Sequence, residues 1–555
     1  MSDQYPHLKT PLDWLYKWES EKPDDIFLSQ PINGKWITFT WKEFGEQVRK
    51  MAATIDGKGL PEKSKIALLS KNCAHWLMTD MAIMMSGHVS VPIYPNVSGD
   101  TVKYILEHSE AKLLFVGKLE ASDWENMSKG VPDGLDCIDF GIYGLAKNNY
   151  QKWDDEVGQV AAIDGNPKRD LDDIMTIIYT SGTTGVPKGV VHKFIAPVYA
   201  GDFFVNAFKI NQQDRFFSYL PLSHIAERML TEIVAITGGA SVHYVESLEK
   251  FQDNLKECQP TIFLAVPRIW AKFMSGVQSK FSDAKLNFLL AVPLVNNIIK
   301  KKIKEALGLT EARVCLTGAA PMAPSMMNWY DKLGICIFEV YGMTENSAYS
   351  HANYPGKRKI GTVGPSLVDV ETIISEEGEI CIKSPTNMVE YYKEPDKTAE
   401  ALKDGFLHTG DKGEIGQDGF VKITGRVKDI FKTSKGKYVA PNPIEMQLIK
   451  NEHIEQVCVV GSGIAQPLAL VELTEKAIKS EKSIVEQSLL ETLKGLNPKL
   501  DHHEKLQKVV VVKGNWTPEN GIMTPTMKIK RNEVDNRYKE SYENWYESED
   551  KVAWE

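Results

Sequence analysis

The chain has 555 residues, of which 43% are hydrophobic and 25% are charged, and its formal net charge is −9. This length exceeds one ordinary hydrophobic core, so we expect two or more domains, and the acidic balance argues against non-specific nucleic-acid binding. Seven scattered cysteines without a C-x-x-C pair indicate neither a zinc site nor a disulfide scaffold.

The N-terminus lacks the basic and apolar regions of a secretory signal, so we expect a cytoplasmic protein. No apolar run reaches the length of a transmembrane helix. The longest candidate, Leu286 to Ile303, is interrupted by Pro293 and followed by Lys300–Lys302. Such a stretch could rest on the inner face of an anionic membrane as a peripheral contact, and a partly buried helix with a solvated end is the alternative.

Up to about residue 170, short apolar runs alternate with helical patterns, which is typical of α/β architecture. Thr40-Trp-Lys-Glu43 fits a capping box at the start of a helix that continues to Ile55. We predict strands at 65–70, 89–94 and 113–117, and a further helix at 101–109.

The next segment, Ile174 to Val190, is the most informative part of the chain. A β-branched run predicts a strand, which leads into hydroxyl and glycine residues from Thr180 to Gly185, followed by Pro187 and Lys188. Backbone N–H groups, hydroxyls and a lysine together suit a polyphosphate. An ordinary loop between two strands is the alternative. The spacing is not that of a Walker A motif, because Lys188 follows a proline and Gly189 occupies the hydroxyl position.

Strands are also predicted at 241–245, 261–266, 313–317 and 335–339. Residues 314–322 suggest a strand–loop–strand unit in which small side chains after Gly318 let a flat ring lie on the backbone. Tyr341 to Glu345 offers an aromatic ring for a base, and a carboxylate and a hydroxyl whose oxygens suit Mg²⁺. Thr409-Gly-Asp411 supplies an acid for ribose hydroxyls.

Beyond about residue 365 the pattern changes to alternating strands at 370–374, 378–383 and 420–424, which predicts a small, mainly β subdomain. A polar joint at 425–429 then separates a tail that is long enough to be a domain, with helices near 444–450 and 482–493. We therefore expect an N-terminal domain at 1–426 and a C-terminal domain at 427–555.

In this order the motifs resemble those of the adenylate-forming superfamily of acyl-CoA synthetases, peptide-synthetase adenylation domains and luciferases. The resemblance runs from about residue 10 to 535 and is strongest to long-chain fatty acyl-CoA synthetases. The motifs that carry it are Tyr179–Gly189, Tyr341–Glu345, Thr409–Asp411 and Gly425-Arg426, and for the long-chain branch Tyr219–Arg228, Val266–Arg268, Lys432–Pro441 and Met523–Lys528. The last departs from the superfamily's commoner S-G-K form.

The resemblance implies an α/β fold: a large N-terminal domain of two α/β subdomains plus a small β subdomain, followed by a mobile small α+β C-terminal domain. It also implies ATP- and Mg²⁺-dependent activation of a fatty acid, through acyl-AMP, to acyl-CoA, with release of AMP and pyrophosphate. The implied partners are small molecules (fatty acid, ATP and coenzyme A) and no nucleic acid, while a monomer and a homodimer both stay open.

By position, the resemblance implies a role for each motif residue. The phosphates would be held by Thr180, Ser181, Gly182, Thr183, Thr184, Gly185 and Lys188. Mg²⁺ would be held by Thr180 and Glu345, and the adenine by Gly318, Ala319, Ala320 and Tyr341. The ribose would meet Asp411, the ribose or phosphates Arg426, and the α-phosphate Thr344. His224 would border the acyl carboxylate and the phosphates, with a satisfied core histidine as the alternative.

The same resemblance places the adenylation lysine at Lys528. A solvated member of the run Lys528–Arg531 is the alternative, and Lys530 is the competitor if the register is shifted. A hinge at Lys428 would rotate the C-terminal domain, withdraw Lys528 and bring the Gly436 loop beside a pantetheine tunnel.

Other functions stay open from sequence alone. A fatty acyl-AMP ligase would deliver the acyl group to a carrier protein instead of coenzyme A. A luciferase-like oxygenase and a catalytically inactive lipid-binding homologue are further alternatives, and a P-loop NTPase would release orthophosphate instead of pyrophosphate.

Overall fold

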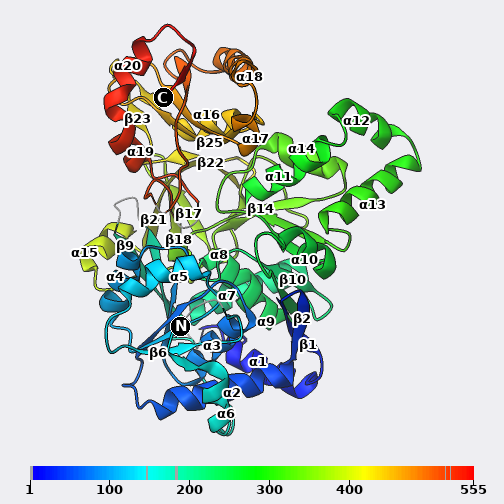
Figure 1. The fold of residues 1–555 in the computed structure, drawn as a ribbon, viewed down its shortest axis with the longest axis vertical. Helices are drawn as coiled ribbons and strands as arrows, with labels where there is room; N and C mark the ends of the chain where they lie inside the picture. Colours follow the sequence, from blue (N-terminus) through cyan, green and yellow to red (C-terminus); the bar gives the residue numbers. More distant parts are fainter. Residues whose placement is uncertain (1–3, 145–147, 182–185, 519, 525–526) are drawn as a thin grey trace.

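The computed structural model describes residues 4–144, 148–181, 186–518, 520–524 and 527–555. Figure 1 shows an elongated molecule in which the first helices lie at one end and the segment after residue 427 forms the other. The strands form two large sheets, a smaller β sheet, a four-stranded C-terminal sheet and a separate two-stranded sheet. This arrangement confirms the predicted α/β class, with a large N-terminal part and a small α+β C-terminal part.

The first large sheet has the strand order β19-β9-β8-β4-β3-β5-β6-β7. Its strands are β3 (Lys65–Leu69), β4 (Val89–Ile93), β5 (Leu113–Val116), β6 (Asp136–Asp139), β7 (Gln151–Lys152), β8 (Ile174–Ser181), β9 (Pro187–Lys193) and β19 (Glu390–Tyr391). Strand β3 pairs in parallel with both β4 and β5, as a βαβ arrangement requires. The predicted strands at 65–70, 89–94 and 113–117 are therefore confirmed.

The second large sheet has the order β15-β14-β13-β12-β10-β11-β1-β2. Its strands are β1 (Ile26–Ile32), β2 (Lys35–Thr40), β10 (Arg215–Ser218), β11 (Ser241–Tyr244), β12 (Ile262–Leu264), β13 (Val314–Thr317), β14 (Ile337–Tyr341) and β15 (His351–Ala352). The N-terminal hairpin of β1 and β2 thus belongs to the second sheet, where β1 pairs with β11. Local patterns cannot predict this, because the partner strand lies more than two hundred residues away.

Three smaller sheets follow, one in the β subdomain and two in the C-terminal part. The β subdomain contains β16 (Gly364–Pro365), β17 (Glu371–Ile374), β18 (Glu379–Lys383), β20 (Leu402–Lys403), β21 (Phe406–Ile415) and β22 (Phe420–Arg426). The C-terminal part contains β23 (Phe431–Lys432), β24 (Tyr438–Val439), β25 (Ile454–Val460), β26 (Leu468–Leu473), β27 (Lys508–Val511) and β28 (Val552–Trp554). The mainly β subdomain after residue 365 is confirmed, whereas the domain boundary at 426/427 stays a prediction.

Helices pack against the sheets (Figure 1), and the fully buried α3 (Ala74–Met85) contacts strands of both large sheets. Those before the β subdomain are α1 (Pro11–Glu21), α2 (Trp41–Gly57), α3 (Ala74–Met85), α4 (Gly99–Ser109), α5 (Ala121–Met127), α6 (Trp153–Gln159), α7 (Ile195–Phe208), α8 (Ile225–Glu227), α9 (Ala235–Gly238), α10 (Phe251–Cys258), α11 (Pro267–Gln278), α12 (Asp283–Ala291), α13 (Val295–Leu307) and α14 (Pro324–Lys332). The later helices are α15 (Pro395–Ala401), α16 (Pro441–Leu448), α17 (Glu475–Ile478), α18 (Lys482–Leu496), α19 (Arg531–Tyr538) and α20 (Tyr542–Glu547).

Helix α2 illustrates how the sequence fixes an element. The Thr40 side chain accepts a hydrogen bond from the backbone N–H of Glu43 (3.2 Å), and the Glu43 carboxylate accepts one from the backbone N–H of Thr40 (2.8 Å). The predicted capping box is therefore confirmed. Phe44, Val48 and Met51 recur at helical spacing and are fully buried, so one face of the helix closes the core.

Two other predictions change in the structure. The strand–loop–strand unit at 314–322 is wrong: β13 ends at Thr317 and no second strand follows before α14, because Pro324 begins that helix. The apolar stretch from Leu286 to Ile303 falls in α12 and α13, which Pro293 separates. Among the described residues, none of the helices combines the length and apolar character needed to cross a bilayer.

Candidate active site

A wide cleft of about 4630 Å³ lies between the large sheets, the β subdomain and the C-terminal part. Most of the predicted site residues line it: Thr180, Lys188, His224, Gly318, Ala319, Ala320, Tyr341, Thr344, Glu345, Asp411, Arg426 and Lys528. The predicted residues Gly182, Thr183, Thr184 and Gly185 lie outside the described residues, as does the side chain of Ser181. Residues more than three hundred positions apart thus face one space.

Gly436 is the exception among the described candidates. It lies in the turn between β23 and β24 with φ of +77°, and it is not among the residues that line the cleft. The structure therefore does not bring Gly436 together with Lys528. In this arrangement the lysine, and not the glycine loop, faces the nucleotide motifs.

The proposed adenine wall is built from β13 and the loop that follows it. A Cβ on Gly318 would lie 3.0 Å from the Val340 side chain and 3.1 Å from the Val340 carbonyl oxygen, so the loop approaches β14 closely. Ala319 adopts φ of +65°, a left-handed conformation that is uncommon outside glycine. A strained backbone with small side chains leaves a flat surface in the cleft wall, where an aromatic base can lie.

Three predicted residues form one hydrogen-bonded group at the β subdomain. Asp411 and Arg426 are cross-strand partners in β21 and β22. The Asp411 carboxylate accepts hydrogen bonds from the Tyr341 hydroxyl (2.7 Å) and from Arg426 Nε (2.8 Å). Burial and the neighbouring Asp411 carboxylate raise the pKa of Tyr341 well above its ordinary value. The carboxylate is thus held in a fixed orientation beside the place where a ribose would lie.

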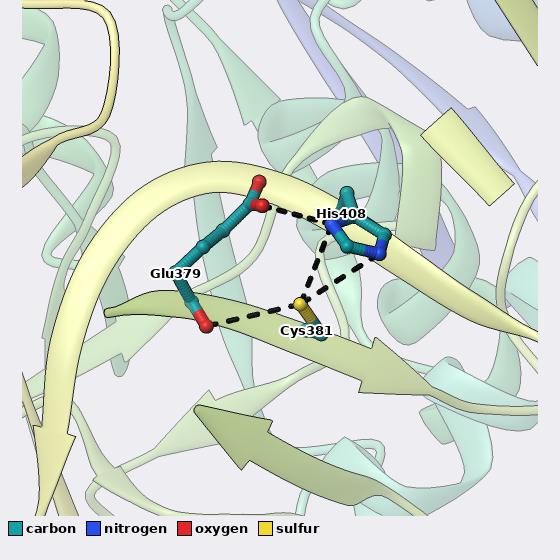
Figure 2. A group of neighbouring side chains, drawn as sticks. All are labelled: Glu379, Cys381 and His408. Carbon is teal, nitrogen blue, oxygen red and sulfur yellow. Dashed lines mark hydrogen bonds and ion pairs between the residues drawn. The ribbon is translucent and has the colours of Figure 1, made fainter. Parts of the chain in front are cut away.

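A second carboxylate holds the Thr409-Gly-Asp411 segment of β21 from behind. Figure 2 shows Glu379 and Cys381 on β18 beside His408 of β21. The Glu379 carboxylate accepts a hydrogen bond from the backbone N–H of Gly410 (2.7 Å), and its other oxygen lies 2.8 Å from His408 Nδ1. Burial, and next the Glu379 charge, raise the pKa of the Cys381 thiol to about 11.

This group has nitrogen, sulfur and oxygen ligand atoms within 4.8 Å of one another. Mg²⁺ prefers oxygen ligands only, so the cluster does not fit that ion. Both oxygens of Glu379 already accept hydrogen bonds or ion pairs from the protein, and the group positions the part of β21 that carries Asp411.

Glu345 occupies the opposite wall, in a short 3₁₀ turn at Thr344–Asn346. Its carboxylate accepts a hydrogen bond from the Tyr391 hydroxyl (2.8 Å), and the Tyr391 ring lies 3.8 Å below Lys188 Nζ. Burial lowers the pKa of Lys188, and the Glu345 charge opposes this effect. Thr180 is the cross-strand partner of Lys188, and both line the cleft with the buried Glu345. The oxygens of Thr180 and Glu345 are of the type that suits Mg²⁺.

The turn that carries Thr344 is fixed from below by His192 on β9. His192 Nε2 lies 2.6 Å from the Thr344 carbonyl oxygen, and burial lowers the pKa of this imidazole to about 4. It is therefore neutral at pH 7 and donates to the carbonyl. A Cβ on Gly342 would lie 2.4 Å from the Ala348 carbonyl carbon, so only glycine fits where the turn closes.

Lys528 reaches the cleft from the C-terminal part. The Lys528 side chain is accessible to solvent within the cleft. Many protein atoms nevertheless surround its ammonium group, and the resulting partial desolvation lowers the pKa of Lys528. Arg426 lowers the pKa further, while Asp411 and Glu345 oppose the shift. Burial, and next the Lys528 charge, lower the pKa of His224 to about 4. These interactions place Lys528 within electrostatic range of both the nucleotide motifs and His224.

His224 has part of the structural role that a satisfied core histidine would have. Its Nδ1 accepts a hydrogen bond from the backbone N–H of Ala226 (3.2 Å) and so caps α8, while the ring lines the cleft. The structural role as a cap is therefore present, and the ring remains at the boundary between the polar and apolar parts of the cleft.

An apolar wall continues from His224 along α8 and the π-helix at Arg228–Val234. The residues that line it include Phe204, Ile225, Ala226, Met229, Leu230 and Val234. Behind the wall, the fully buried Arg228 pairs with Asp80 and with Glu232 (3.0 Å). Because this guanidinium is anchored in the core, the π-helix is held in place and its apolar face is turned to the cleft.

Glu227 is a buried acid that sequence reasoning did not select. Asn72 Nδ2 lies 3.5 Å and Thr231 Oγ1 3.4 Å from its Oε1, and burial raises its pKa to about 8. Because the pKa of Glu227 is higher in the folded state than in the unfolded state, this group contributes most to the free energy of unfolding at low pH. The contribution is lost as the pH rises from about 4.5 to about 8.

The Glu227→Gln variant is therefore expected to be more stable than the wild type at pH 8, by an amount that shrinks toward pH 5. A neutral amide of the same size keeps the hydrogen bonds and avoids a buried charge. Denaturant unfolding at several pH values measures the effect, and the exposed Glu62→Gln serves as the control. Equal pH dependence of the wild type and Glu227→Gln would contradict the prediction.

The sequence matches the AMP-binding enzyme family over residues 15–392 and the C-terminal domain of AMP-binding enzymes over residues 428–550. The chain belongs to the family of AMP-binding enzymes. Among its relatives, long chain acyl-CoA synthetase 4 of Arabidopsis thaliana is 28% identical, with 93% of this chain and 88% of that protein aligned. The long-chain-fatty-acid–CoA ligase FadD15 of Mycobacterium bovis is 26% identical, with 96% of each chain aligned.

Solved structures share the fold. The anthranilate CoA ligase AuaEII in complex with anthranoyl-AMP has a TM-score of 0.79 at 20% identity, covering 97% of this chain and 98% of that one. The o-succinylbenzoate CoA synthetase MenE from Bacillus subtilis, with an acyl-adenylate bound, has a TM-score of 0.73 at 20% identity, covering 95% and 98%. The predicted membership of the adenylate-forming superfamily is confirmed, and ATP, Mg²⁺ and coenzyme A are consistent with it.

Several residues of the site were missed from the sequence. Tyr391 belongs to the two-residue strand β19, and only the pairing of β19 with β9 brings its ring under Lys188. Glu379 and His408 lie on different strands and become partners through the register of β18 and β21. His192 reads as part of a strand, and its contact with Thr344 depends on the tertiary fold.

Proposed function

We propose that this protein activates a long-chain fatty acid with ATP and Mg²⁺, through acyl-AMP, to acyl-CoA. The observation that carries the proposal is the convergence of Lys528, Glu345 and the Lys188 strand on one cleft whose other wall is apolar. A polar nucleotide site that adjoins an apolar wall fits a substrate with one carboxylate and one hydrocarbon chain.

In the first step, a carboxylate oxygen of the fatty acid attacks the α-phosphorus of ATP, and the bond from that phosphorus to pyrophosphate breaks. Two anions approach each other, so the barrier is largely electrostatic. Lys188, Lys528 and Arg426 line the cleft and would neutralise the charge that develops on the phosphates. Thr180 and Glu345 would hold Mg²⁺, which when bound neutralises pyrophosphate as it leaves.

In the second step, the thiol of coenzyme A loses its proton to solvent and its sulfur attacks the acyl-AMP carbonyl carbon. The bond from that carbon to the phosphate oxygen breaks, and AMP leaves with the bonding electron pair. Lys528 has no part in this step. We propose that the C-terminal domain, residues 427–555, rotates about Lys428, withdraws the lysine and brings the Gly436 turn toward the cleft. The position of Gly436 outside the cleft wall in this structure supports a need for such a movement.

The apolar wall beside His224 supports the choice of a fatty acid. Burial of each methylene contributes about 0.8 kcal/mol, so a long wall favours long chains. The names of the relatives from Arabidopsis thaliana and Mycobacterium bovis point to the same substrate class. A fatty acyl-AMP ligase that loads a carrier protein is the second candidate, because it would use the same first step.

The test is a pyrophosphate-release panel over fatty acids from about C4 to C20 and aromatic acids, with and without coenzyme A. We expect release to increase with chain length and acyl-CoA to form only when coenzyme A is present. Acyl-AMP that accumulates without conversion to acyl-CoA would favour the carrier-protein ligase. A lack of pyrophosphate release with every acid would overturn the proposed function.

A further inference from the structure

The α12–α13 hairpin, residues 283–307, reaches out from the body of the molecule (Figure 1). Its tip is the turn Val292–Leu294 between the two helices. Only Leu286, Ile303 and Leu307 of the two helices are buried, so the inner face alone contacts the core. The hairpin therefore has an outer face and a tip that no other described part of the chain covers.

The uncovered part carries large apolar side chains. Phe288 is 68% exposed, Leu294 82% and Ile298 55%, and each lies within one or two helical turns of the tip. Single exposed apolar residues are common on soluble proteins, but a cluster on a projecting tip marks an interaction site. The chemistry of the surrounding residues indicates what the tip contacts.

The tip also has an unusual backbone. Leu294 adopts φ of +68° and ψ of −45°, and the Val295 N–H donates to the Pro293 carbonyl oxygen (2.9 Å) across it. A γ-turn with positive φ is rare and costly for a leucine. Since the Leu294 side chain gains no burial in the protein, the turn serves to present it outward.

Lysines surround the apolar tip one turn or more away from it. Five lysines against two acids give residues 283–307 a formal charge of +3, although the whole chain has −9. Lys285 precedes Phe288 by three positions, and Lys301 and Lys302 follow Ile298 by three and four, so each pair shares a helix face. Apolar residues at a tip with lysines behind it suit the boundary between acyl chains and anionic headgroups.

The hairpin is also part of the cleft wall. Ile299, Ile303 and Leu307 of α13 line the cleft, while Ile298 and Lys301 point away from the core. One helix therefore connects the exposed tip to the space in which the substrate would bind.

We propose that the α12–α13 hairpin docks this protein on an anionic lipid bilayer, with Phe288, Leu294 and Ile298 at the level of the acyl chains. The lysines contact the headgroups, and the mouth of the cleft then lies close to the membrane surface. The proposal goes beyond the proposed function and does not depend on it, because docking is measured without catalysis.

The test is flotation of the full-length protein with phosphatidylcholine vesicles, with or without about 30% phosphatidylglycerol. The wild type is expected to float with the anionic vesicles, less so at high salt, and hydrogen exchange at 288–298 should slow on binding. Phe288→Ser/Leu294→Ser is expected to lower the partition coefficient at least about tenfold. Lys285→Glu/Lys301→Glu should lower it by roughly 10- to 30-fold.

Matched controls lie on the C-terminal part. Ile484 is 53% exposed, much like Ile298. Ile484→Ser is therefore the control for Ile298→Ser, because it shows the general effect of removing an exposed isoleucine. Lys476→Glu/Lys482→Glu tests the general effect of charge, and thermal unfolding confirms that each variant is folded. Wild-type protein that stays with the solvent, or hairpin variants that float like the wild type, would overturn the proposal. So would self-association through the tip without vesicles.

Discussion

Replacing Lys528 with alanine is expected to lower the rate of acyl-AMP formation by roughly 10²- to 10³-fold and to leave thioester formation from supplied acyl-AMP intact. The lysine lies within electrostatic range of Glu345, Asp411 and His224, where charge would build as pyrophosphate leaves. Thioester formation has no developing phosphate charge at this position, so the second step does not need the lysine. Pyrophosphate exchange and single-turnover thioester formation measure the two steps separately.

The matched control for this variant is Lys530→Ala, two positions further along the same run. Lys530 precedes α19 as its N-cap residue, and its backbone N–H donates to the Ile522 carbonyl oxygen (2.8 Å). Alanine keeps that backbone bond. Loss of adenylation in Lys530→Ala with normal activity in Lys528→Ala would move the role to Lys530, and loss of both steps in Lys528→Ala would refute the division between them.

Local sequence signals predicted the elements well. The capping box at Thr40 and Glu43, the β-branched run of β8 and the alternating strands of the β subdomain depend on neighbouring residues, and the structure confirms each. The motif residues were also predicted as one group, and twelve of them line one cleft. That prediction depended on the resemblance of whole motifs, because each motif alone is a common turn or loop.

Tertiary partners could not be predicted in this way. The N-terminal hairpin joins the second sheet, and the partner of Glu345 is a tyrosine that follows it by forty-six positions. Glu227 has an ordinary helical neighbourhood in sequence, and its raised pKa arises from burial among Asn72 and Thr231. Such contacts depend on strand order and packing, which residue patterns within a segment do not contain.

Two ion pairs bear on the proposed rotation of the C-terminal part. Arg268 on α11 forms an ion pair with Glu455 on β25, which links the large and small parts of the chain. Just beyond Lys428, the Asp429 carboxylate pairs with Arg531 (3.3 Å) within the C-terminal part. In the proposed rotation, the residues after Lys428 would move with the C-terminal part, and the exposed Arg268 pair would have to break.

The Lys428→Pro variant is expected to keep adenylation near the wild-type rate and to lower thioester formation by at least about tenfold. Proline fixes φ near −65° and restricts the preceding residue, so the joint can no longer absorb the change that a domain rotation requires. Lys428 is not among the described non-glycine residues with positive φ, so a left-handed backbone does not oppose proline at this position.

Lys428→Ala is the matched control, because it removes the same charge and leaves the backbone free. It should retain both steps. Lys428→Pro, in contrast, should accumulate acyl-AMP and convert it only slowly to acyl-CoA and AMP when coenzyme A is added. Rapid-quench measurement of acyl-AMP and acyl-CoA in one turnover separates the two variants. Full overall turnover in Lys428→Pro would mean that no rotation about this residue is needed, and the same cleft arrangement would then have to serve both steps with Lys528 in place.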